Sequence, residues 1–150
     1  MSNYILELKW RCSTTLLKKI LDPAHQVPDS HQEETLGVTI VPRAGFPKVG
    51  SPDRTFTTHI WDFGGQDIQY HLHQFFLADR SLYILMLDDR RECATLDYWF
   101  NIIRILGEGS PVLVVLNKIN KTTVSSFDFY KYQKRYSQLK MEQLSVDFSE

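Results

Sequence analysis

Cysteine is scarce in this chain, and long apolar runs are missing from it. Its two cysteines, Cys12 and Cys93, cannot build a disulfide framework and have no C-x-x-C partner, which is typical of reduced thiols. No apolar run approaches the roughly 20 residues that a helix needs to cross a bilayer. The first residues also lack the apolar segment and small-residue cleavage site of a signal peptide. We therefore expect a cytoplasmic protein without a membrane span.

Net charge is close to zero, because 17 Lys and Arg residues and 18 Asp and Glu residues leave a formal charge of −1. This balance gives no electrostatic argument for binding to nucleic acid or to an acidic membrane. Internal repeats and low-complexity segments are missing as well. The 150 residues suffice for a sizeable core, and we expect a single domain over 1–150.

Short strand-like runs alternate with helical patterns along the chain. Strands are expected at 4–8, 35–41, 55–61, 82–87, 112–116 and 143–148, and helices at 13–21, 67–80, 96–106 and 127–139. The segment 41–53, rich in Pro and Gly, is expected to be a long loop. The continuous apolar runs at 82–87 and 112–116 are typical of strands covered on both faces. The strand at 35–41 should pair antiparallel with the strand at 55–61. The pattern predicts a three-layer α/β fold whose sheet is mostly parallel with one antiparallel edge strand.

The run W-D-F-G-G-Q at 61–66 is the most informative in the chain. It ends a strand-like segment, and its adjacent glycines free the backbone for a tight turn. Asp62 at a strand end is suited to hold Mg²⁺, directly or through water, and Gln66 can orient an attacking water. The alternative is an ordinary hairpin turn that begins with an acid.

Polar side chains also follow other expected strands. Asp62, Asp88 and Asn117 all stand where a strand ends, and parallel α/β sheets bind their ligands at the carboxyl ends of strands. The Asn117 amide can contact a purine edge, while the stem of Lys118 can cover the face of the base. The sequence therefore predicts one ligand-binding rim.

With these motifs in place, the chain resembles a known family, the Roc (Ras of complex proteins) GTPase domain of Roco proteins. The motifs that carry the resemblance are W-D-F-G-G-Q at 61–66, H-Q-F-F-L at 73–77, R-S-L-Y at 80–83, D-Y-W at 97–99, S-P-V at 110–112 and N-K at 117–118. The resemblance covers nearly the whole chain and is weaker at both ends. It implies a Ras-like P-loop NTPase fold and GTP or GDP with Mg²⁺ as the ligand. Other domains or subunits of a Roco-type protein are the implied partners.

The resemblance also implies roles for individual residues. The implied nucleotide contacts are Ser13, Thr14, Thr15, Asp62, Gly65, Asn117, Lys118 and Asn120. The implied metal ligands are Thr14, Thr35 and Asp62. The implied catalytic residues are Gln66 and Thr35. Thr35 is similar to the first-switch threonine that ligates Mg²⁺, and Gln66 would lie beside the attacking water. The implied activity is that of a molecular switch with slow GTP hydrolysis.

The chain departs from the family at the phosphate loop, whose pattern is G-x-x-x-x-G-K-[ST]. Counting back from Thr14, Ser13 takes the lysine position, and Cys12 and Glu7 take the two glycine positions. A glutamate repels phosphate, and a Cβ at a glycine position blocks the conformation of the loop. The alternative function is therefore a degenerate module that binds nucleotide weakly or not at all and acts in protein–protein contacts.

Two further departures concern the base and the end of the chain. Asn120 stands where the family usually has aspartate, and its amide offers one acceptor and one donor group in place of two acceptors. Guanine discrimination should weaken, and a base with an acceptor at C2 should be tolerated better. The family's final helix and its COR domain are absent from 1–150, so a fragment of a longer protein is one expectation.

Two other patterns allow a functional interpretation beside a plain structural one. His59, His71 and His73 can be combined into a zinc site, but positions i and i+2 of a helix do not share a face, which favours structural histidines. The Lys and Tyr residues of 127–139 suit single-stranded nucleic acid, and the balanced net charge favours a solvated helix face.

Overall fold

The computed structural model describes residues 3–9, 13–26, 38–48, 50–63, 81–88, 96–117 and 127–147. Its strands are β1 (Asn3–Lys9), β2 (Val38–Lys48), β3 (Ser51–Phe63), β4 (Ser81–Asp88), β5 (Val112–Asn117) and β6 (Met141–Val146). Its helices are α1 (Ser13–Leu21), α3 (Leu96–Leu106) and α4 (Phe129–Arg135). No helix follows β6 within these ranges. The expected helix 67–80 lies outside the described residues.

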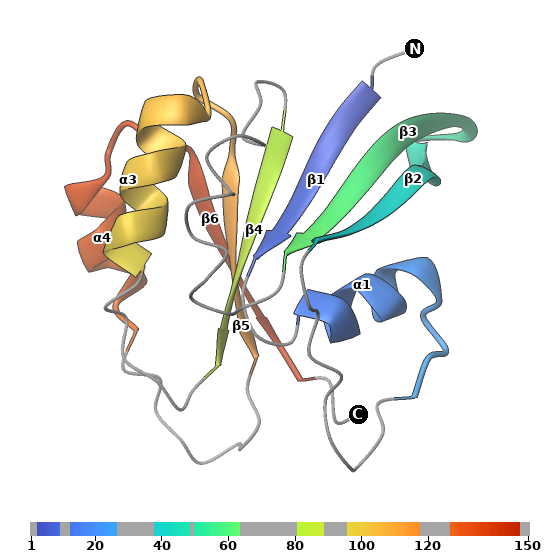
Figure 1. The fold of residues 1–150 in the computed structure, drawn as a ribbon, viewed down its shortest axis with the longest axis horizontal. Helices are drawn as coiled ribbons and strands as arrows, with labels where there is room; N and C mark the ends of the chain where they lie inside the picture. Colours follow the sequence, from blue (N-terminus) through green and yellow to red (C-terminus); the bar gives the residue numbers. More distant parts are fainter. Residues whose placement is uncertain are drawn as a thin grey trace.

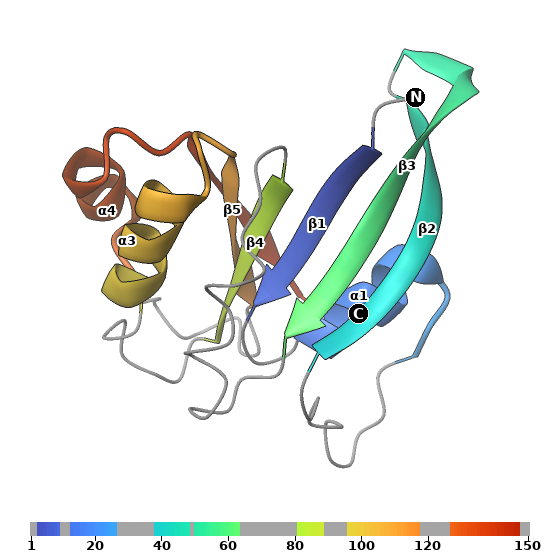
Figure 2. The same cartoon turned by 45° about the horizontal axis from the view of Figure 1, so that its top comes forward.

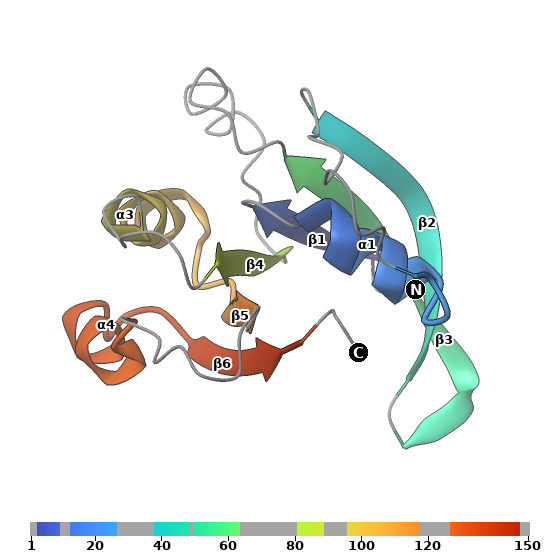
Figure 3. The same cartoon turned by 90° about the horizontal axis from the view of Figure 1, so that it is seen from below.

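The six strands form one sheet in the order β2-β3-β1-β4-β5-β6. β2 pairs antiparallel with β3 at one edge, and every other neighbouring pair is parallel. Helix α1 lies on one face of the sheet, and α3 and α4 lie on the other (Figures 1 and 3). This arrangement confirms the predicted three-layer α/β fold with a mostly parallel sheet and an antiparallel edge strand.

The central strands bury alternate side chains on opposite faces of the sheet, as the period of a strand requires. On β4, Tyr83 and Leu85 pack into the cluster beneath α3 and α4. Ile84 and Met86 join Leu17 of α1 on the other face. The continuous apolar runs are thus strands covered on both faces, as the sequence predicted.

Helix α3 has the predicted bounds 96–106. Its buried residues are Leu96, Trp99, Phe100 and Ile103. Leu106, the last apolar residue of the helix, is 37% exposed. The 3.6-residue period carries the buried stripe from Ile103 to Gly107 instead. A Cβ at Gly107 would lie 3.1 Å from the Tyr83 ring, so the helix end packs there through bare backbone.

The predicted loop 41–53 is wrong, because β2 and β3 run through it as one long hairpin. The hairpin turns at Gly50, whose φ of 76° favours glycine. Pro42 and Pro47 are tolerated because β2 is an edge strand, and a register shift at Pro42 marks a bulge. The pairing of β1 with β3 reaches only to Thr57, so the outer part of the hairpin extends beyond β1 (Figure 2).

Helix α4 is shorter than the predicted 127–139. It begins after Asp128, whose Oδ1 accepts a hydrogen bond from the Lys131 backbone N–H at 3.0 Å. It ends because Tyr136 leaves the helical conformation, with φ −112° and ψ 49°. The following strand β6 accordingly begins two residues before the predicted 143–148.

Candidate functional site

The first turn of α1 is hydrogen-bonded to the end of β3. The Thr14 hydroxyl Oγ1 donates to Asp62 Oδ2 across 2.9 Å. Asp62 is fully buried, one residue before the end of the strand, and Thr14 is half-buried. The contact joins residues 48 positions apart, both of them metal ligands by resemblance to the family.

The sheet register explains this contact. Leu8 of β1 lies opposite Asp62 of β3 in a parallel pair, so both strands end at the same edge of the sheet. Helix α1 starts at Ser13 and is held against the sheet by buried Leu17, which packs in the cluster that contains Ile60. The chain therefore reverses direction beside Asp62, and the first turn of the helix reaches that carboxylate.

A hydroxyl and a carboxylate side by side are hard oxygen donors, the kind that Mg²⁺ prefers. In P-loop NTPases a Ser or Thr hydroxyl and an aspartate hold the metal beside the phosphates. Thr14 and Asp62 fit that donor set. A cluster of three or more His, Cys, Asp or Glu side chains is not found among the described residues. His59 lies in β3, while His71 and His73 fall outside the described ranges.

Asp88 and Asn117 are the last residues of β4 and β5 and are direct partners in the parallel pairing of these strands. Asn117 is 6% exposed. Since β1 lies between β3 and β4, the ends of β3, β4 and β5 occupy the same edge of the sheet as the start of α1. The three polar positions converge on one rim, as the sequence predicted.

The remaining predicted site residues divide into two groups. Ser13 and Thr15 lie in the first turn of α1, on either side of Thr14. The others, which lie outside the described residues, are Thr35, Gly65, Gln66, Lys118 and Asn120.

Glu7 lies within β1 and not in a loop. It is paired with Trp61 of β3 on one side and with Tyr83 of β4 on the other. The strand continues to Lys9, and helix α1 begins at Ser13, so only residues 10–12 separate the two elements. The eight-residue phosphate-loop pattern would need the chain from position 7 onward to be loop. The described fold leaves a shorter connection.

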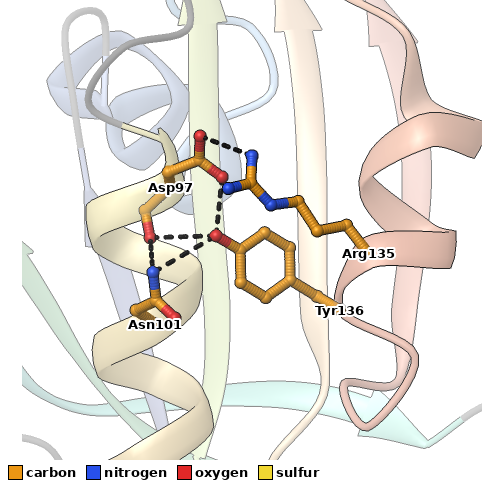
Figure 4. Close-up of polar contacts among 4 residues, drawn as sticks. All are labelled: Asp97, Asn101, Arg135 and Tyr136. Atoms are coloured by element: carbon orange, nitrogen blue, oxygen red, sulfur yellow. Dashed lines mark hydrogen bonds and ion pairs between the residues drawn. The ribbon is translucent and has the colours of Figure 1, made fainter.

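A second polar cluster joins α3 to the end of α4 (Figure 4). The Tyr136 hydroxyl donates to Asp97 Oδ1 at 2.6 Å, and Arg135 Nη1 lies 3.0 Å from Asp97 Oδ2. Asn101 Nδ2 donates to the Asp97 carbonyl at 2.8 Å. Burial, together with the hydrogen bond to Asp97, raises the pKa of Tyr136 to about 12. The hydroxyl therefore stays protonated and acts as a donor at neutral pH.

Sequence reasoning missed this cluster because it grouped Tyr136 with the exposed tyrosines of the basic helix. Tyr136 is only 4% exposed and packs in the core. The spacing of Phe129, Tyr132 and Tyr136 at i, i+3 and i+7 is the signal that places these rings on one buried helix face.

Comparison with known proteins agrees with this geometry. The family described as "Ras of Complex, Roc, domain of DAPkinase" matches residues 13–120. A Roc-COR-CHAT protease of Runella zeae is 33% identical over 120 residues, covering 70% of this chain and 13% of the protease. The probable serine/threonine-protein kinase roco5 of Dictyostelium discoideum is 41% identical over 69 residues, covering 43% of this chain and 2% of the kinase.

Among solved structures, the chain matches that of Methanosarcina barkeri Roco2 RocCORdC bound to GDP. The TM-score is 0.78 at 34% identity, and the match covers 99% of this chain and 44% of the solved one. The sheet order, the helix layers and this match define a Ras-like α/β domain. The chain belongs to the Roc family of such domains. It spans less than half of the length of the relatives it matches, and none of its described helices is long and apolar enough to cross a membrane.

Proposed function

We propose that this Roc domain binds guanine nucleotide with Mg²⁺ and acts as a molecular switch with slow GTP hydrolysis. The observation that supports this function best is the hydrogen bond of 2.9 Å between Thr14 and buried Asp62. It holds together, at the carboxyl edge of the sheet, the two oxygen donors that we propose as Mg²⁺ ligands. The relative Roco2, with the same fold, was solved bound to GDP.

Each predicted site residue has a role in the proposed function. Thr14 and Asp62 would hold Mg²⁺, which neutralises charge on the phosphates when bound. Asn117, fixed at the end of β5, would contact the base together with Lys118 and Asn120. Ser13, Thr15 and Gly65 would contribute the remaining nucleotide contacts. Thr35 would be a further Mg²⁺ ligand and would take part in catalysis with Gln66, which would lie beside the attacking water. Other domains of a Roco-type protein in the cytoplasm would receive the signal.

A second candidate function is that of a degenerate module that acts through protein contacts. The observation that favours it is the position of Glu7 inside β1, with only residues 10–12 between strand and helix. Ser13 also replaces the lysine of the phosphate loop. Loss of one charge-assisted contact costs roughly 1.5–3 kcal/mol, which is roughly a 10- to 150-fold loss of affinity.

Titration with a fluorescent GTP analogue in Mg²⁺ separates these two functions. Binding at low-micromolar concentration, lost in EDTA and in Asp62→Ala, supports the switch. No binding at millimolar nucleotide rejects the switch and leaves the degenerate module. The matched control is Thr55→Val, set against Thr14→Val, because it also removes one threonine hydroxyl but lies in the exposed outer part of β3.

Competition with other nucleotides tests the base contacts in the same assay. With an amide at Asn120, XTP should compete at a concentration comparable to that of GTP, because xanthine has an acceptor at C2. ATP should compete poorly. Equal competition by all three would show that the rim around Asn117 does not select the base.

A further inference from the structure

We propose that the outer face of α4 is a docking surface for an acidic segment of a partner protein. This α4 basic face consists of Tyr130, Lys131, Lys134 and Arg135. Its members are exposed, and Tyr130 reaches 80%. Spacings of i, i+3 and i+4 place these side chains along one side of the helix.

The opposite side of α4 is used for packing. Phe129 and Tyr132 pack against the core cluster, and the Tyr132 ring lies 5.5 Å from the ring of Phe100 in α3. The helix therefore has one side that holds it to the fold and one side turned to solvent. Lys131 and Lys134 lie on the solvent side, and Arg135 lies at its border, where it pairs with Asp97.

The charge of the α4 basic face is only partly compensated. Arg135 is paired with Asp97 at 3.0 Å. In the described part of the chain Lys131 and Lys134 have no ion-pair partner, and α4 has no acidic residue in its first turn. Asp128 caps the helix through the Lys131 backbone N–H. Since the whole chain has a net charge of −1, this is a local positive surface on a domain that is otherwise slightly negative.

Helix stability accounts for only part of this charge. Cations in the last turn complement the helix dipole, which explains Lys134 and Arg135. Lys131 stands in the first turn, where the dipole disfavours a positive charge. A cation at that position suits a partner that brings negative charge.

The face is also held in a fixed position. The Tyr136 hydroxyl and the Arg135 guanidinium both bind Asp97 at the start of α3, and Asn101 donates to the Tyr136 hydroxyl at 3.3 Å (Figure 4). Anchored cations lose less freedom when they bind than cations on a mobile segment do.

The dimensions of the face favour a short peptide over other polyanions. A helix of seven residues is about 10 Å long, which is small for a bilayer surface or a nucleic-acid backbone. The negative charge of the remaining chain repels extended polyanions. The exposed ring of Tyr130 beside Lys134 offers apolar contact at one end, as tyrosines of protein interfaces do.

Fluorescence anisotropy with the full chain and a labelled short peptide, Asp-Glu-Asp-Glu-Leu, tests this proposal. Binding should weaken about fivefold in Lys134→Glu and at least about 20-fold in Lys131→Glu/Lys134→Glu, and it should fall as salt rises. Lys48→Glu is the matched control, because Lys48 is also an exposed lysine but lies in the β2–β3 hairpin. It should leave binding within about twofold.

Three results would overturn the proposal. The first is that Lys48→Glu and Lys134→Glu weaken peptide binding equally. The second is that the unchanged chain does not bind the peptide measurably. The third is that the unchanged chain binds single-stranded RNA or anionic vesicles of equal charge more tightly than the peptide. The thermal midpoint of each variant should match that of the unchanged chain, since the substituted side chains are exposed. The GTP titration is measured independently, so failure of docking and failure of nucleotide binding are distinguished.

Discussion

The Thr14 hydroxyl donates a hydrogen bond to the buried carboxylate of Asp62 across 2.9 Å, and this contact ties the first turn of α1 to the end of β3. It links a helix to a strand, two elements that share no backbone pairing. The same two side chains are the proposed Mg²⁺ ligands.

Replacing Thr14 with valine should destabilise the protein by about 1–3 kcal/mol, because a buried carboxylate loses a hydrogen-bond donor. Urea unfolding in the absence of Mg²⁺ and nucleotide measures this change. Thr15→Val removes a hydroxyl from the adjacent position and should change the free energy of unfolding by about 0.5 kcal/mol or less. Equal effects of the two variants would contradict a special role of the Thr14–Asp62 bond.

Introducing the lysine of the phosphate-loop pattern at position 13 should raise nucleotide affinity under the proposed function. Ser13→Lys, combined with Cys12→Gly, should tighten GTP binding by about tenfold or more, since it adds a charge-assisted contact to phosphate. Adding Glu7→Gly should give no further gain, because position 7 lies within β1. The fluorescent GTP titration measures all three proteins. A large gain from the third substitution alone would place the start of the loop at position 7.

Removing the Tyr136 hydroxyl should loosen α4 from α3. Tyr136→Phe should lower the free energy of unfolding by about 1–2 kcal/mol, because the hydroxyl donates to a carboxylate that is itself partly exposed. Tyr130→Phe removes the hydroxyl of an 80% exposed ring and should have almost no effect. Urea unfolding followed by tryptophan fluorescence provides the comparison.

The contribution of the Tyr136 hydroxyl to the free energy of unfolding should change at high pH. Burial and the bond to Asp97 raise the pKa of Tyr136 from 10.0 to about 12 in the folded protein. A group with a raised folded-state pKa contributes its stabilisation fully below the unfolded value and loses it as the pH approaches the folded value. The stability difference between the unchanged chain and Tyr136→Phe should therefore shrink from about pH 10 to about pH 12. A difference that stays constant over this range would contradict the assignment.

Glycine at position 107 is required by close packing. A Cβ there would lie 2.6 Å from the Ile103 carbonyl oxygen and 3.1 Å from the Tyr83 ring. Gly107→Ala should destabilise the domain by about 1–3 kcal/mol. Gly45→Ala is the control, since nothing lies within 4 Å of the added Cβ, and it should change stability by about 0.5 kcal/mol or less. Thermal unfolding of both variants tests the difference.

Much of the fold could be predicted from sequence because its signals are local. The bounds of α1 and α3 follow from apolar spacing and from the residues that stop each helix, and β4 and β5 follow from unbroken apolar runs. The hairpin over 41–53 could not be predicted, because its prolines and glycines are locally typical of a loop. Pairing with β3 at the sheet edge outweighs that local preference.

The candidate site shows the same division. Asp62, Asp88 and Asn117 were identifiable because each follows a strand-like run, and strand ends are visible in sequence. The distance between Thr14 and Asp62 could not be predicted from the sequence, because it depends on the register of β1 against β3. A short hairpin turn can fix the register of neighbouring strands, but β1 and β3 are distant in the sequence and no such turn joins them.

The sequence by itself determined the family, the order of strands and helices, and which residue types stand at the carboxyl edge of the sheet. Only the tertiary structure decided that β1 continues past Glu7 to Lys9 and that Tyr136 is buried against Asp97. The physical reason is that composition and periodicity are properties of neighbouring residues. Burial and hydrogen bonding across the fold depend on which distant elements the chain brings together.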